Sequence, residues 1–168
     1  MQLTSFTDYG LRSLMYLAKR ADRISSVKEI AEYYGISRHH LVKVVHCLGQ
    51  LGYIETTKGK GGGIRLLRDA KKLRLGELIV ALEPSMVIVE CFDKATNTCR
   101  IADSCQLKRY LREAYKAFIE TLNQYTLADV MKHPGLFSEL SNQHSSASVV
   151  LHDQTGQNPR GKIKAKIA

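Results

Sequence analysis

The fold is indicated most clearly by residues 26–67, which read SVKEIAEYYGISRHHLVKVVHCLGQLGYIETTKGKGGGIRLL. Ser26 and Glu29 have the spacing of a capping box, in which a hydroxyl and a carboxylate satisfy free backbone N–H groups at the start of a helix. A short helix is therefore predicted after Ser26, and Gly35 is suited to end it. Ser37 is a favourable N-cap, so a second helix is predicted directly after this glycine turn.

The second helix of this stretch has one apolar face and one basic face. Its apolar residues recur at the i, i+3, i+4, i+7 spacing of a single helix face, namely Leu41, Val44, Val45 and Leu48. Its first turn and opposite face carry Arg38, His39, His40, Lys43 and His46. Two short helices joined by a glycine turn are typical of a helix-turn-helix, whose second helix enters the major groove of DNA. For this segment alone, a helical hairpin with a solvated polar face is the alternative.

The residues that follow favour the DNA-binding interpretation, because they predict a β-hairpin. The hairpin is expected as a strand, a glycine-rich turn and a return strand over residues 52–57, 58–63 and 64–67. A hairpin directly after a helix-turn-helix is a wing, and Lys58, Lys60 and Arg65 are candidates for contacts with DNA. A phosphate-binding P-loop is excluded, because Lys60 is followed by Gly61 and not by Ser or Thr.

Positive charge is concentrated in the N-terminal half of the chain. Residues 1–83 carry 14 Lys and Arg against 8 Asp and Glu, whereas residues 84–137 carry 7 against 6. The whole chain has 168 residues and a formal net charge of +9. Such a distribution is expected of a domain that meets a polyanion, although a soluble surface that happens to be basic is the alternative.

The chain is expected to be a cytoplasmic protein that makes no contact with a membrane. No apolar run approaches the roughly 20 residues of a membrane span. The N-terminus, MQLTSFTD, lacks the basic and apolar regions of a secretory signal. The four cysteines are therefore expected to be reduced, and able to bind a metal or to sense redox conditions.

Three cysteines, Cys91, Cys99 and Cys105, lie in a segment expected to be an irregular loop. They lack the close pair that structural zinc sites usually contain. Their long spacing suits a larger group such as an iron–sulfur cluster, and free N–H groups of a helix starting at Cys105 would favour an anionic cluster. A disulfide, or three unrelated thiols, is the alternative. Cys47 is expected to be a small buried apolar residue.

Residues 106–130 predict one long helix with an apolar seam. The seam residues step by four and three, at Leu111, Tyr115, Phe118, Leu122 and Tyr125. This pattern favours dimerisation, which would pair two recognition helices on a two-fold DNA site. Packing of the helix against its own N-terminal domain is the alternative.

The sequence thus predicts a mainly α fold with a small β-hairpin wing, a winged helix-turn-helix followed by a long dimerisation helix. Four segments are expected. They are a DNA-binding domain (1–83), a cysteine loop (84–105), a dimerisation helix with a further helical segment (106–137) and a disordered tail (138–168). No Ser/His/Asp or Cys/His catalytic arrangement is found, so the protein is not expected to be an enzyme.

Four features together resemble the IscR-like winged-helix iron–sulfur regulators, and in particular their nitric-oxide-sensing repressors. They are LTSFTDYGLR at residues 3–12, GIS at residues 35–37, KGKGGG at residues 58–63 and the three spaced cysteines. The resemblance covers roughly residues 1–135. It implies a homodimeric repressor that binds palindromic DNA while its cluster, either 2Fe–2S or 4Fe–4S, is intact, and releases the DNA when nitric oxide reacts with the cluster.

The resemblance also implies a set of cluster ligands, namely Cys91, Cys99 and Cys105, with Asp8 of the other subunit as the fourth. Other members use a His three residues after the last Cys. This chain has Lys108 there, whose ammonium has no lone pair to offer, and this departure favours the nitric-oxide-sensing branch.

Alternatives remain open both for the role of Asp8 and for the function. Asp8 also suits the start of a helix, with an ion pair to Arg12 four residues on. The alternative functions are a thiol- or zinc-switched DNA-binding regulator and a regulator of cluster homeostasis.

Overall fold

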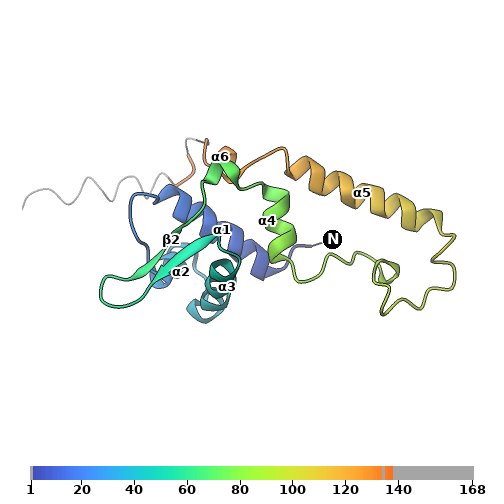
Figure 1. The fold of residues 1–168 in the computed structure, drawn as a ribbon, viewed down its shortest axis with the longest axis horizontal. Helices are drawn as coiled ribbons and strands as arrows, with labels where there is room; N and C mark the ends of the chain where they lie inside the picture. Colours follow the sequence, from blue (N-terminus) through green and yellow to red (C-terminus); the bar gives the residue numbers. More distant parts are fainter. Residues whose placement is uncertain (1, 134, 138–168) are drawn as a thin grey trace, which may run out of the picture. The chain divides into compact units, whose positions relative to one another are not determined.

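The computed structural model describes residues 2–133 and 135–137, and the predicted tail, 138–168, lies outside these described residues. Helices dominate and the strands form one hairpin, which confirms the predicted mainly helical fold with a small β-hairpin (Figure 1). In chain order the elements are α1 (Ser5–Lys19), α2 (Val27–Tyr34), α3 (Arg38–Gln50), β1 (Ile54–Thr57), β2 (Gly63–Leu66), α4 (Leu75–Leu82), α5 (Gln106–Leu122) and α6 (Leu127–Val130). Two 3-10 helices lie at Ala70–Lys72 and Glu90–Phe92.

The first three helices pack around one apolar core. Leu14 and Leu17 of α1, Ile30 of α2, and Leu41 and Leu48 of α3 are each at most 1% exposed. Burial of a side chain of this size contributes roughly 1.5–3 kcal/mol. The predicted apolar face of α3 is therefore confirmed, and it fixes which side of α3 remains in solvent.

The ends of the two short helices follow the local sequence closely. The Glu29 N–H donates to Ser26 Oγ over 3.1 Å and the Ser26 N–H donates to Glu29 Oε2 over 3.5 Å, which confirms the capping box. Gly35 ends α2 with a φ of 63°, in the left-handed region that favours glycine. Ser37 precedes α3 as predicted, but its hydroxyl makes no capping hydrogen bond.

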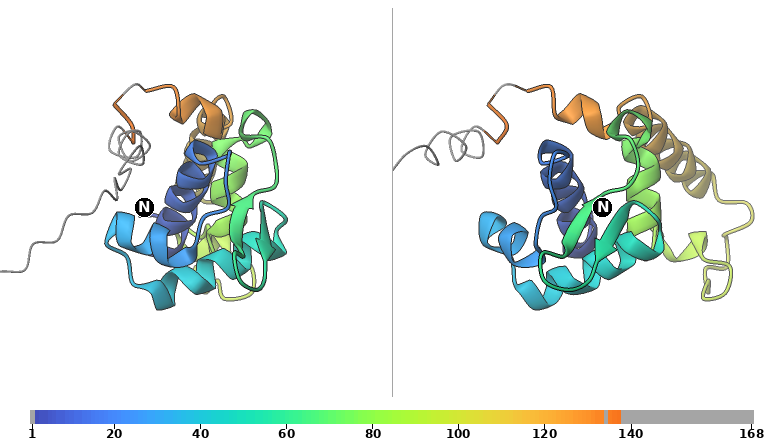
Figure 2. Two further views of the ribbon diagram at one scale, coloured as in Figure 1. Left: turned by 90° about the vertical axis from the view of Figure 1, so that its left-hand side faces the viewer. Right: turned by 60° about the vertical axis from the view of Figure 1, so that its left-hand side comes forward.

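The hairpin packs beside α3 and is held along one edge by the segment before α2 (Figure 2). Its strands pair antiparallel, with Ile54 opposite Leu66. The Ser25 N–H donates to Ile64 O over 2.9 Å and the Ile64 N–H donates to Ser25 O over 2.8 Å. A Cβ at Gly63 would lie 2.5 Å from Ser25 O, so only glycine permits this approach.

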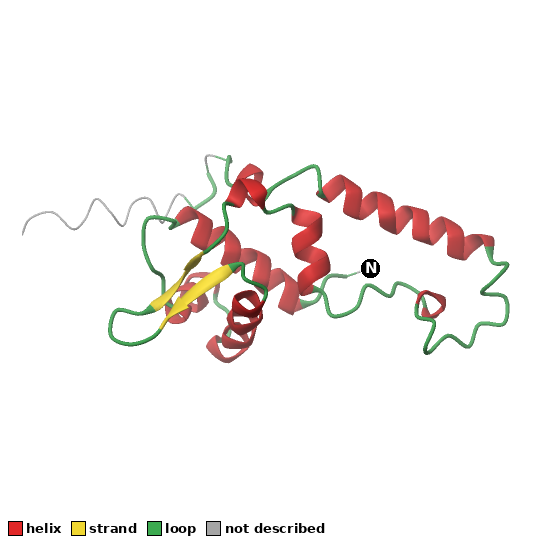
Figure 3. Cartoon of the chain, viewed as in Figure 1, coloured by secondary structure: helices red, strands yellow, loops and turns green. Residues whose placement is uncertain are grey.

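The long helix predicted over residues 106–130 is wrong in its length, because α5 ends at Leu122 (Figure 3). A new capping box starts α6, in which the Asp129 N–H donates to Thr126 Oγ1 and the Thr126 N–H donates to Asp129 Oδ2 over 2.8 Å. Tyr125 lies between the two helices, where its carbonyl accepts a hydrogen bond from the Leu75 N–H over 3.0 Å. It therefore does not belong to the helical seam.

None of the residues of α5 is buried. Its partly covered apolar side chains are Leu111, Tyr115, Phe118, Ile119 and Leu122. Two further apolar side chains, Leu107 and Tyr110, are 63% and 55% exposed. The apolar face of α5 is thus only partly covered by the described part of the chain.

No helix among residues 2–133 and 135–137 combines the length and the apolar character that crossing a lipid bilayer requires.

Candidate DNA-binding surface and cysteine loop

The outward face of α3 gathers all the helix residues that the sequence predicts as DNA contacts. Burial of the Leu41 side leaves the opposite side of the helix in solvent, and all five candidates are exposed: Arg38, His39, His40, Lys43 and His46. The helix contains no Asp or Glu. Apart from the exposed Val42, the face therefore presents basic and neutral hydrogen-bonding groups, the side-chain types that contact phosphates and base edges.

The wing contributes further positive charge, although one of its candidates is engaged. Lys58 and Lys60 are exposed in the turn between β1 and β2, and neither is ion-paired within the described part of the chain. Arg65 pairs across the hairpin with Glu55, with its Nε donating to Glu55 Oε2 over 2.7 Å. The sequence did not predict this pair, because it depends on the strand register. The two lysines are therefore the stronger candidates for DNA contacts.

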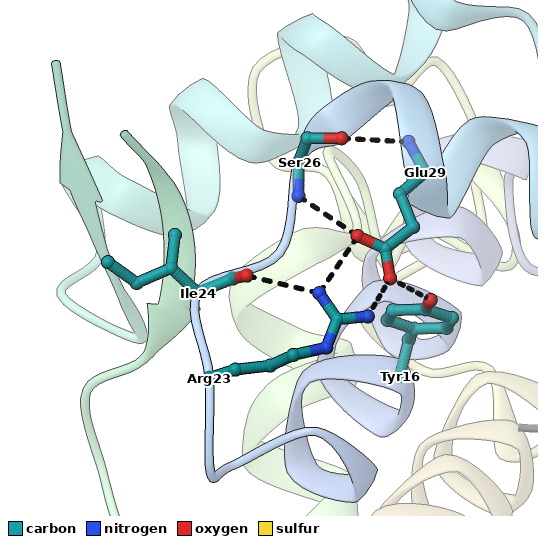
Figure 4. Close-up of polar contacts among 5 residues, drawn as sticks. All are labelled: Tyr16, Arg23, Ile24, Ser26 and Glu29. Atoms are coloured by element: carbon teal, nitrogen blue, oxygen red, sulfur yellow. Dashed lines mark hydrogen bonds and ion pairs between the residues drawn. The ribbon is translucent and has the colours of Figure 1, made fainter. Parts of the chain in front are cut away.

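A hydrogen-bonded network beneath α2 holds the helix-turn-helix against α1 (Figure 4). Tyr16 Oη donates to Glu29 Oε1 over 2.5 Å, and Arg23 Nη1 donates to Glu29 Oε2 over 3.1 Å. Arg23 Nη2 forms an ion pair with the other Glu29 oxygen, and Arg23 Nη1 also donates to Ile24 O over 3.2 Å. Because Ser25 follows at the edge of the hairpin, the network links α1, α2 and the wing.

The network sets the pKa values of its members. Burial opposes ionisation of Glu29, but the hydrogen bonds from Arg23 and Tyr16 outweigh it and lower the pKa of this carboxyl. Burial, together with the hydrogen bond to Glu29, raises the pKa of Tyr16 to about 12. The carboxylate is therefore ionised and the phenol protonated at neutral pH.

Glu29→Gln is expected to destabilise the folded protein by about 1–2 kcal/mol at pH 7, the range for a hydrogen-bonded ion pair that solvent partly screens. Because folding lowers the pKa of Glu29 from its ordinary 4.5, the stabilisation is present above that pH and is lost as the pH falls through the folded-state pKa. Urea unfolding at pH 7 and pH 3.5 should show a smaller difference from wild type at the lower pH.

Glu32→Gln is the matched control, because Glu32 pairs with Lys28 on the surface of the same helix at 3.6 Å and both side chains are mostly exposed. It is expected to change stability little at either pH. An effect of Glu29→Gln that is the same at both pH values would contradict the role of its charge.

Asp8 lies in the first turn of α1, where it forms an ion pair with Arg12. The sequence analysis gives this ion pair as the alternative to a role of Asp8 as a metal ligand. Arg12 Nε donates to Asp8 Oδ1 over 3.0 Å, and Arg12 Nη2 lies 2.9 Å from Asp8 Oδ2. Both side chains are 43% exposed. The carboxylate is thus accessible to a second molecule, but within its own chain it is held by the guanidinium.

The start of the cysteine loop is tied to the same end of α1 by a residue that the sequence analysis did not find. Glu83 directly follows α4, and its Oε2 accepts from Thr7 Oγ1 over 2.6 Å, from Thr4 N over 3.1 Å and from Thr4 Oγ1 over 3.3 Å. Thr7 is fully buried. Glu83 lies 76 residues from Thr7, so no local pattern could have indicated the contact.

The three loop cysteines are unpaired and partly buried, but they are not gathered into a site. Cys91 lies in the 3-10 helix Glu90–Phe92, and Cys105 is the N-cap of α5, where its sulfur accepts a hydrogen bond from the Lys108 N–H over 3.4 Å. No three His, Cys, Asp or Glu side chains in residues 2–133 and 135–137 lie together so that they could hold a metal ion. Cys47, expected to be buried, is also partly exposed.

The chemistry of this donor set fits an iron–sulfur cluster. Three unpaired thiols on one loop supply soft ligands, and the N-terminus of α5 favours an anion beside Cys105. Lys108 donates its backbone N–H to the Cys105 sulfur, and its side chain can only donate, so a fourth ligand has to come from elsewhere.

Comparison with known proteins gives a consistent result. The model of the Rrf2 family, described as "Iron-dependent Transcriptional regulator", matches residues 3–133. The chain is 48% identical over 134 residues to the HTH-type transcriptional regulator NsrR of Bacillus subtilis, which covers 79% of this chain and 92% of that protein. It is also 48% identical over 132 residues to the HTH-type transcriptional regulator NsrR of Shouchella clausii, with 78% and 89% covered.

Solved structures show the same fold. T. potens IscR matches with a TM-score of 0.62 and 23% sequence identity, over 79% of this chain and 87% of that one.

Proposed function

Since this chain belongs to the Rrf2 family of iron-dependent transcriptional regulators, we propose that it is a cytoplasmic, homodimeric repressor controlled by an iron–sulfur cluster and by nitric oxide. It is a helix-turn-helix regulator and not an enzyme. One arrangement in the structure gives the proposal its main support. An exposed basic α3 and wing stand in the same compact unit as a loop with three unpaired thiols, and that loop starts at the residue that holds the N-terminus of α1.

The cluster ligands would be the thiolates of Cys91, Cys99 and Cys105, with Asp8 of the partner subunit as the fourth. When bound, the cluster supplies iron that reacts with nitric oxide. The residues of this chain would pass the change at the cluster to the DNA-binding surface. Asp8 stands in the first turn of α1, and α1 packs on α3, so a bond that holds Asp8 also holds the recognition helix. Loss of that bond would return the Asp8 carboxylate to its ion pair with Arg12 in the same helix.

The separation of two recognition helices has to match about one turn of DNA or a multiple of it. A link between the cysteine loop of one protomer and α1 of its partner would fix that separation. The link would then have two states, intact and broken, and both nitric oxide and DNA would favour one state over the other. Such a shared two-state element is what coupling between two binding sites requires.

Asp8→Ala is expected to weaken operator binding by about 5- to 20-fold and to reduce the further loss of affinity that nitric oxide causes. The variant removes the link between subunits and leaves the three thiols in place. Iron content and fluorescence-based DNA titration, both under anaerobic conditions, measure the two effects. The control is Glu32→Ala, which removes an ion pair of the same i,i+4 spacing on α2. Normal affinity together with a normal response to nitric oxide would refute the link.

Replacing Lys58 and Lys60 together with Ala is expected to lower the slope of log K against log salt concentration by about 2, because each phosphate contact contributes roughly 0.9. Titrations of operator DNA at several salt concentrations give the slope. Lys19→Ala, in the last turn of α1, is the control and should leave the slope unchanged. An unchanged slope in the double variant would show that the wing does not contact the DNA backbone.

The experiment that tests the function as a whole is an absorption spectrum of the anaerobically purified protein before and after addition of nitric oxide, paired with a DNA shift assay. The proposal expects a brown protein that contains iron and sulfide, binds a palindromic duplex and releases it on exposure to the gas. A colourless protein with zinc or a disulfide would favour the thiol- or zinc-switched alternative. A brown protein whose DNA binding ignores nitric oxide would favour cluster homeostasis.

A further inference from the structure

One side chain at the end of α5 forms hydrogen bonds at the contact between α4 and α5. Asn123 follows the last residue of α5, and its Oδ1 accepts a hydrogen bond from the Glu77 N–H over 2.9 Å. This N–H belongs to the first turn of α4, where amides have no partner within the helix. The Asn123 carbonyl accepts from Arg74 Nη1 over 2.6 Å. One asparagine thus joins the end of α5 to the beginning of α4.

The two helices also approach more closely at this point than any side chain would allow. A Cβ at Gly76 would lie 2.5 Å from Asn123 Oδ1 and 2.6 Å from Ile119 O. Gly76 is buried, and its φ is not in the left-handed region, so the glycine is needed for space and not for backbone conformation. The junction therefore has one tight geometry.

The connection after α5 strengthens the same junction. The Leu75 N–H donates to Tyr125 O over 3.0 Å and the Leu127 N–H donates to Leu73 O over 2.8 Å, so the chain on each side of Arg74 and Thr126 pairs like two short strands. The end of α5 is held by backbone bonds as well as by the Asn123 side chain.

The other end of α4 is fixed to α1 in a similar way. A Cβ at Gly10 of α1 would lie 2.7 Å from Leu82 Cδ1, and Glu83 accepts hydrogen bonds from Thr4 and Thr7. Leu82 is 3% exposed. α1 packs on α3, so an unbroken series of close contacts runs from α5 through α4 and α1 to the recognition helix.

We propose that α4 is a rigid coupler and that Asn123 is the positioning residue that sets the angle between the dimerisation helix and the DNA-binding domain, and hence the half-site spacing that the dimer accepts. The inference rests on the proposed function, because it requires a dimer formed through α5 and a palindromic site. Within the described residues no side chain of α5 is fully buried, so a second copy of α5 is expected to pack on its apolar face, and the junction at Asn123 then decides where each recognition helix stands.

The test compares operator spacing in wild type, Asn123→Ala, Asn123→Asp and Gln124→Ala. The DNA is a duplex selected from a random pool by the full-length wild-type protein under anaerobic conditions, together with duplexes that have one base pair more or fewer at the centre. Each base pair changes the separation by about 3.4 Å, a step that a rigid dimer should resist. Wild type should bind the selected spacing at least about 10-fold more tightly than the altered ones.

Asn123→Ala is expected to bind the selected spacing about 5- to 20-fold more weakly and to discriminate less between spacings, because the side-chain bond that joins the end of α5 to the first turn of α4 is lost. Dimerisation and binding to a single half-site should be unchanged. Asn123→Asp keeps an acceptor for the Glu77 N–H and should restore the spacing preference. Gln124→Ala, at an exposed neighbouring position, is the control and should behave as wild type.

A second measurement does not depend on DNA. A spin label on a ketone-bearing amino acid at Gln50, an exposed residue at the end of α3, reports the distance between the two recognition helices of the dimer. The distance distribution should be broader in Asn123→Ala than in wild type and Asn123→Asp.

The outcomes separate the inference from the function on which it rests. A wild-type protein that forms no dimer, or selects no palindrome, overturns the proposed function and this inference with it. A wild-type dimer that selects a palindrome, combined with an Asn123→Ala variant of unchanged spacing preference and label distance, overturns the inference alone. A uniform loss of affinity at all spacings also overturns it, because that is the result of a merely structural defect.

Discussion

Replacing Cys99 with Ser is expected to leave the purified protein without bound iron and to lower its affinity for operator DNA by about 10- to 100-fold, the range of coupling between linked sites. The thiolate is the form of cysteine that binds metal, and a serine hydroxyl is not ionised at neutral pH. Cys99 lies in the middle of the loop, is partly exposed and forms no disulfide. Its replacement therefore removes a proposed ligand without disturbing the core.

Iron and sulfide analysis, the visible absorption spectrum and anaerobic DNA titration measure this effect. Cys47→Ser is the matched control, because Cys47 is the one cysteine of the sequence outside the loop segment and should leave the iron content unchanged. Circular dichroism should show the same helix content in both variants. A Cys99→Ser protein that retains iron at the wild-type level would show that this thiol is not a ligand.

Leu111→Glu is expected to convert the proposed dimer into a monomer and to reduce the affinity for palindromic DNA by about 10²- to 10⁴-fold, because the second half-site is then no longer bound by a linked domain. Leu111 belongs to the apolar seam of α5 and lies more than two helical turns before the residues that contact α4. A charge in the seam is costly to bury against a second helix, whereas it is well solvated in the monomer.

Sedimentation equilibrium and DNA titration measure the two parts of this prediction. Ala117→Glu is the control, since it introduces the same charge at an exposed position of α5 away from the seam. It should leave the dimer intact. A dimeric Leu111→Glu protein would show that the seam is not the interface, and that the apolar face of α5 has a different role.

Features that depend on residues near one another in the chain could be predicted from the sequence. The capping box of Ser26 and Glu29, the left-handed Gly35 and the apolar face of α3 are all present in the structure. Each arises from contacts over a few residues, so the spacing of residue types contains the necessary information. The exposure of the predicted DNA contacts on α3 also follows from local spacing, because burial of one face of a helix leaves the opposite face in solvent.

Predictions that needed long-range contacts were less accurate. The apolar spacing continues to Tyr125 and so predicts a longer helix, but the chain leaves the helix where backbone groups of residues 73 and 75 offer hydrogen bonds. Arg65 stays a predicted DNA contact, but the hairpin register, which the sequence does not give, pairs it with Glu55. In both cases the deciding partner lies ten or more residues away.

By itself, the sequence indicated a basic winged helix-turn-helix, a long amphipathic helix after it and three thiols on one polar loop. Only the tertiary structure decided which ends of these elements are joined. Glu83 holds the start of the loop to α1, and Asn123 holds the end of α5 to α4. These bonds join residues that are 76 and 46 positions apart in the sequence. A single carboxylate or amide side chain forms no repeating pattern, so the sequence alone does not indicate its distant partner. Their partners are chosen by the packing of the helices, which brings distant backbone and side-chain groups within hydrogen-bonding distance.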